Sequence, residues 1–84
     1  SVVEEIQLSQ ISDLTESLFE ATNELRDKIR NATSQKGIIE KAWAYRKQVI
    51  PAMERLRTSA DALELLVPSS QWPFPSYTDI LYNI

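Results

Sequence analysis

The chain has 84 residues and a formal net charge of −3. So short a chain forms one small domain at most. It contains no cysteine, no histidine and a single glycine, which excludes disulfides, thiolate or imidazole metal sites and glycine-rich phosphate loops. The acidic balance argues against nucleic acid as a partner, and no apolar run approaches the roughly 18 residues of a membrane span.

Residues 2–32 are predicted to form a first long helix. No proline or glycine interrupts them, and good helix formers dominate. Acidic residues early in the segment and basic residues late suit the helix dipole, and the charges are typical of a solvated face. Apolar residues recur at three- and four-residue spacing, which places them on one side of a helix. They are Ile11, Leu14, Leu18, Ala21, Leu25 and Ala32.

A short polar break follows between residues 31 and 37. Thr33 or Ser34 is expected to cap the next helix, and Asn31 or Gly37 to adopt the left-handed conformation of a tight turn. A break this short makes the two helices antiparallel neighbours.

A second long helix is predicted over residues 34–67. Its apolar seam is interrupted only by Arg46, whose guanidinium is expected to reach an acid of the first helix. Pro51 is expected on the side opposite the seam, with a bend near residues 47–51. Trp43 and Ile50 flank the seam and are interpreted as extra core or as cover for a third element, with ligand stacking as the alternative. The seam consists of Ile39, Ala42, Arg46, Val49, Met53, Leu56, Ala60, Leu63 and Val67.

The composition changes after Val67, so residues 1–67 are predicted to be a helical hairpin and residues 68–84 a proline- and aromatic-rich tail. Alternating prolines and aromatics from Gln71 to Tyr77 predict extended chain, and Ser76 with Asp79 reads as the cap of a short helix over residues 77–82. The tail is rich in apolar side chains, so it is expected to pack across the hairpin or onto another surface.

Two stretches together resemble a known family. The first is Lys41-Ala-Trp-Ala-Tyr-Arg-Lys-Gln-Val-Ile-Pro-Ala-Met-Glu-Arg-Leu-Arg57, continued by Ala60-Asp61 and Leu63-Glu64. The second is Trp72-Pro-Phe-Pro-Ser-Tyr77 with Asp79-Ile80-Leu81. Both are similar to the C-terminal end of type III glutamine synthetases, and the similarity is specific in the second half of the chain. Because the chain starts with Ser1, we expect a piece excised from a longer protein.

The resemblance implies a parent enzyme that is cytoplasmic, forms a large oligomer and joins ammonia to glutamate with ATP and a divalent metal such as Mg²⁺. The motifs that carry this chemistry in the family lie upstream, so no catalytic, cofactor-binding or metal-binding residue is assigned to the fragment. Its expected partners are the rest of the parent enzyme or a neighbouring subunit, with self-association completing a bundle. The candidate packing residues are Trp43, Ile50, Met53, Leu56, Leu63, Trp72, Phe74, Tyr77 and Leu81.

Two other function classes fit the pattern. One is an independent interaction module that accepts a partner helix in a groove of the hairpin. The other is a small all-helical enzyme similar to chorismate mutase, in which Arg46, Arg55 and Arg57 would bind a dicarboxylate. Of these three arginines, only Arg46 falls in the seam.

Overall fold

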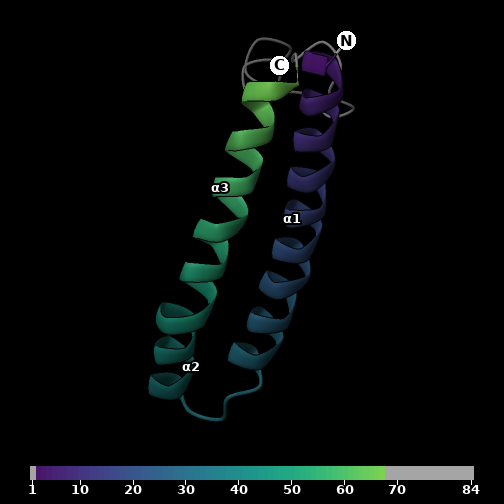
Figure 1. Ribbon diagram of the computed structural model, residues 1–84. Helices are drawn as coiled ribbons and strands as arrows, with labels where there is room; N and C mark the ends of the chain where they lie inside the picture. The colour runs from purple at the N-terminus through teal and green to yellow at the C-terminus, as the bar shows by residue number, and fades with distance from the viewer. Residues whose placement is uncertain (1, 68–84) are drawn as a thin grey trace, which may run out of the picture.

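Two long helical segments lie side by side and antiparallel in the structure, a computed structural model that describes residues 2–67 (Figure 1). The first is α1 (Val2–Thr33). The second runs without a break through α2 (Ile38–Ala44), the π-helix η1 (Tyr45–Val49) and α3 (Ile50–Leu66). The described residues contain no strand, so the predicted all-helical class is confirmed for them. The predictions for residues 68–84 lie outside the described residues.

The end of α1 satisfies its own carbonyl groups. The Thr33 hydroxyl donates to the Arg30 carbonyl at 3.1 Å, and the Ser34 hydroxyl donates to the Asn31 carbonyl at 2.7 Å. These bonds use the last carbonyls of the helix, which have no partner within it. Both hydroxyls therefore serve the end of α1, and the prediction that one of them caps the next helix is wrong.

The second helical segment begins four residues later than predicted, at Ile38. Its N-cap is Gly37, which has φ −105° and ψ 156° and offers no side chain to the free amides of the first turn. No residue between 2 and 67 has a positive φ, so the predicted left-handed turn is wrong. Residues 34–37 instead connect the helices in conformations that any residue adopts.

The irregular turn η1 ends two residues before Pro51. The Ile50 amide donates to the Tyr45 carbonyl, five residues back, which is the pattern of a π-helix. Pro51 explains the turn, because a proline ring clashes with the carbonyl four residues earlier and has no amide to donate. The wider π turn moves that carbonyl away. The sequence predicted a bend near residues 47–51, and the structure has a π turn over Tyr45–Val49 in this part of the segment.

The contact between the two segments is built from small side chains. The buried positions are Ala21 and Ala32 on α1, Ala44 and Val49 before α3, and Ala52 and Leu63 on α3. Ala32, Ala44 and Val49 pack together with Leu25 against them. Alanine on both helices lets the backbones approach closely, but it removes little apolar area from water. Among residues 2–67, no large side chain is completely buried.

The π turn also explains why the predicted seam fails before it, at Ile39 and Ala42, but not the exposure of Met53, which lies after the turn in α3. Val49 and Leu63 are buried against α1, in agreement with the seam, whereas Ile39, Ala42 and Met53 are exposed. A π turn holds one residue more than an α turn, so it shifts the phase of everything before it relative to α3. Ala44 therefore takes the inward position that a regular helix would have given to Ala42 or Arg46.

Candidate functional site

An apolar hollow between α1 and α3 is the first candidate site. It has a volume of about 360 Å³ and is lined by Leu25, Ile50, Met53, Glu54, Leu56 and Arg57, which we call the α3 patch. Leu25 reaches it from α1 and the other residues from α3. Met53 is 53% exposed and Ile50 is 48% exposed, so both of these large side chains remain in contact with water.

A second apolar hollow lies beyond the π turn. Its volume is about 240 Å³, and it is lined by Ile38, Ile39, Ala42, Trp43 and Arg46, which we call the α2 patch. The Lys47 ammonium lies 5.0 Å from the centre of the Trp43 ring, a distance at which a cation is attracted to the ring face. Half of Trp43 is exposed nevertheless. Arg46 makes no ion pair with α1 within the described part of the chain, so that prediction is wrong.

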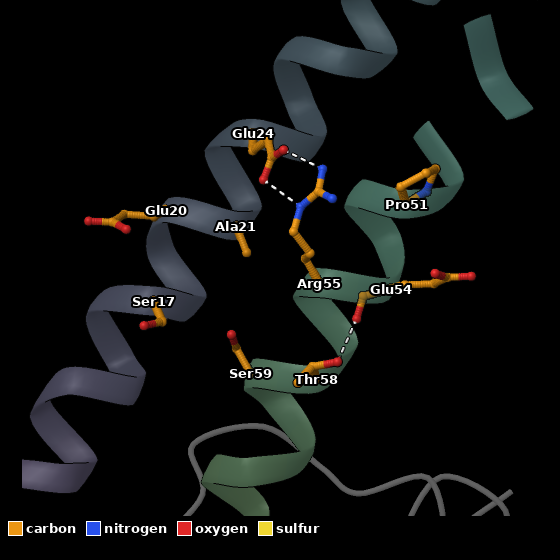
Figure 2. Close-up of a pocket in the computed structure, with 9 residues that line it drawn as sticks. All are labelled: Ser17, Glu20, Ala21, Glu24, Pro51, Glu54, Arg55, Thr58 and Ser59. Atoms are coloured by element: carbon orange, nitrogen blue, oxygen red, sulfur yellow. Dashed lines mark hydrogen bonds and ion pairs between the residues drawn. The ribbon is translucent and has the colours of Figure 1, made fainter. Parts of the chain in front are cut away.

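An open groove of about 580 Å³ runs along another side of the hairpin (Figure 2). Arg55 crosses it from α3 and binds Glu24 of α1 with two hydrogen bonds, of which the one from Nε to Oε2 measures 3.1 Å. The Arg55 guanidinium lowers the pKa of the Glu24 carboxyl, chiefly through this hydrogen bond, and Glu24 raises the pKa of Arg55 by the same contact. A bidentate pair contributes geometric specificity as well as energy, so this pair fixes the relative position of the two helices.

The other groups of this groove do not converge. Figure 2 shows the Glu20 carboxylate pointing away from α3 and the Glu54 carboxylate pointing away from α1. The Thr58 hydroxyl is used in a 2.9 Å bond to the Glu54 carbonyl. Pro51 lines this open groove and is partly buried, on another side of α3 from Met53. Only Glu24 and Arg55 therefore interact across the groove, and each neutralises the other.

The arginines of the enzyme hypothesis are separated in the structure. Arg55 lines the open groove, Arg57 the α3 patch and Arg46 the α2 patch. Arg57 also lies 3.8 Å from Asp61 of its own helix. A dicarboxylate needs cations that converge on one point, and these three do not. In residues 2–67, acidic side chains form no group of three close enough to hold a metal ion.

None of the helices between residues 2 and 67 combines the length and the apolar character needed to cross a membrane.

The structure divides the predicted packing residues into three groups. Leu63 is buried against α1, Leu56 is half-buried, and Trp43, Ile50 and Met53 are exposed. The remaining four candidates, Trp72, Phe74, Tyr77 and Leu81, lie outside the described residues.

Two contacts between polar side chains of the two helices were not predicted from the sequence. Besides Glu24 and Arg55, the Asn31 amide donates to the Gln48 side-chain oxygen at 2.6 Å. The residue types suit such contacts, but choosing the partners requires the register of the two helices. The π turn changes that register.

Two glutamine synthetases are similar to this chain. The enzyme of Bacteroides fragilis (strain YCH46) is 27% identical over 76 residues, which cover 90% of the chain and 10% of that protein. The type-3 glutamine synthetase of Dictyostelium discoideum is 33% identical over 79 residues, which cover 90% of the chain and 11% of that protein. The chain thus spans about a tenth of the length of these curated relatives. No protein-family profile and no solved structure matches it. The resemblance to type III glutamine synthetases is therefore confirmed as sequence similarity to a short segment of two glutamine synthetases, one of them of type 3.

Proposed function

We propose that this chain is the C-terminal helical assembly region of a type III glutamine synthetase. In this proposal it packs against the catalytic body or a neighbouring subunit, in the cytoplasm. The parent enzyme would make glutamine from glutamate and ammonia with ATP and Mg²⁺, and the fragment would be inactive by itself. ATP and metal would bind elsewhere in the parent.

The exposed apolar side chains of a segment related to glutamine synthetases carry the proposal. In the α3 patch and the α2 patch, the side chains of Ile39, Trp43, Ile50 and Met53 are exposed to water. Exposed apolar patches of this kind mark surfaces that another surface covers. The polar residues of the open groove, by contrast, offer no nucleophile next to a base. Burial by another surface is therefore a better account of these helices than chemistry within them.

The test uses the full parent enzyme. The double substitution Ile50→Ser/Met53→Ser should produce smaller assemblies in sedimentation velocity, together with a loss of glutamine synthesis in proportion. Leu65→Ser is the matched control, because Leu65 is 88% exposed on the same helix and lines neither patch. Assemblies of unchanged mass in the double variant would contradict the assembly role.

The independent interaction module is the second candidate, and the apolar lining of the α3 patch favours it. The reading frame that encodes the chain distinguishes the two proposals. An assembly region is encoded within the reading frame of the enzyme, whereas an independent module has a reading frame without the catalytic portion.

A further inference from the structure

Charge is distributed very unevenly along the hairpin. All nine basic residues of the chain lie between Arg26 and Arg57, with three acidic residues among them, so this range has a formal charge of +6. Residues 2–25 contain six acidic residues and residues 58–67 contain two, with no basic residue in either range, which gives −8. We call residues 26–57 the basic half and the other two ranges the acidic half.

The fold gathers these ranges at opposite ends of the molecule. Because the helices are antiparallel (Figure 1), most of residues 2–25 lie beside residues 58–67, and the two halves meet where Glu24 binds Arg55. Near the chain ends, the Gln7 side chain donates to the Leu66 carbonyl at 3.4 Å. The basic half contains the connection between the helices and lies at the other end. The dipoles of two antiparallel helices largely cancel, so side chains determine this polarity.

Both halves carry exposed apolar side chains toward one side of the hairpin. In the basic half these are Ile50 and Met53 of the α3 patch. In the acidic half Leu8 is 66% exposed. Leu8 lies three heptads before Ile29, which follows Leu25 by about one turn, and Leu25 lines the α3 patch. At about 100° per residue, Leu8 stands about 100° round α1 from Leu25 and about 160° from Glu24, so it lies on the flank of α1 that faces away from the open groove and toward the side of the α3 patch.

We propose that a second copy of this chain docks on the α3 patch in antiparallel orientation. The basic half of each copy then faces the acidic half of the other, and Ile50 of each copy lies near Leu8 of its partner. A parallel arrangement would place +6 beside +6 and −8 beside −8, whereas the antiparallel one pairs opposite charges twice. A two-fold axis relates the copies, as in most homodimers, and closes a four-helix bundle. This inference rests on the proposed assembly role and specifies its partner and orientation.

The absence of cysteine from the chain makes a direct test possible. The variants Leu8→Cys and Ile50→Cys of the 84-residue chain are prepared separately, mixed and treated with a short bis-maleimide cross-linker. The mixture should give cross-linked dimers in at least several-fold excess over either variant alone. Leu65→Cys mixed with Leu8→Cys is the control, because Leu65 is as accessible but lies outside the patch. Met53→Cys replaces Ile50→Cys if circular dichroism shows that the latter loses its helices.

Two results would overturn the inference. One is efficient cross-linking within Leu8→Cys alone or Ile50→Cys alone, which indicates a parallel pair. The other is a monomer in sedimentation equilibrium at all concentrations, as expected if residues 68–84 or another partner cover the patch. Either result leaves the assembly role to the separate test on the full enzyme, so the two failures are distinguishable.

Discussion

The pair Glu24–Arg55 links stability to pH at the scale of single residues. Because the folded chain lowers the pKa of Glu24 below its ordinary value of 4.5, the pair stabilises the fold above that value. The contribution is lost as pH falls through the lowered pKa of the folded state, while Arg55 stays charged. Urea midpoints measured from pH 6 to pH 3 should therefore fall more steeply in the wild type than in Glu24→Gln.

Glu20→Gln is the control for this titration. Glu20 lines the same groove but points away from α3 (Figure 2), so its removal should leave the steep pH dependence in place. Equal slopes for Glu24→Gln and the wild type would show that the pair does not stabilise the fold.

The start of α2 lacks a side-chain cap and offers a second residue-scale prediction. Gly37 is the N-cap, and a Cβ built on it would lie 1.7 Å from an Oε2 atom of Glu40, three residues later. That flexible carboxylate must move for any larger residue. Gly37→Ser would create the serine–glutamate spacing of a capping box. It should be more stable than Gly37→Ala by about 1 kcal/mol in urea denaturation at one protein concentration, because both move Glu40 and only serine caps. Equal stability would mean that no cap forms.

At the scale of the helix, close packing depends on alanine. Ala52 has no exposed surface, and it lies on the side of α3 that faces α1. Ala52→Leu should destabilise the fold by about 1–3 kcal/mol, because three extra carbon atoms must be forced between two packed backbones. Ala42→Leu makes the same change at an exposed position of α2 and should stay within about 0.5 kcal/mol of the wild type. Similar losses in both variants, measured by thermal unfolding, would contradict this packing.

The helices themselves could be predicted from the sequence because they depend on local properties. The uninterrupted helix formers of residues 2–32 and the regular apolar spacing after Val49 give α1 and α3 within a few residues. The phase of the segment from Ile38 to Ala44 could not be predicted in this way. It depends on how the helix accommodates Pro51, which has no amide to donate. A bend and a π turn can both accommodate it, but they bury different residues. The α2 patch results from that choice.

At the scale of the whole molecule, the described hairpin has a thin core. Its buried side chains are four alanines, one valine and one leucine, and the remaining large apolar residues keep some contact with water. Each completely buried large side chain contributes roughly 1.5–3 kcal/mol, and small domains have few such side chains to offset the entropy of folding. The hairpin therefore gains more stability from packing against a second surface than a domain with a larger core would. Its charges select the orientation in which that surface packs.

The dependence of Kd on salt concentration distinguishes the two orientations of a self-associated pair. Raising NaCl from about 20 mM to about 500 mM shortens the screening length to a few ångströms, which removes attraction between the acidic half and the basic half. We expect Kd from sedimentation equilibrium to rise at least several-fold for the wild type. Arg46→Glu/Lys47→Glu lowers the charge of the basic half from +6 to +2 and should flatten this dependence. A parallel pair brings like charges together, so screening would strengthen it and Kd would fall. A Kd that falls or stays constant with salt thus contradicts the antiparallel arrangement, whatever the contribution of the apolar patch.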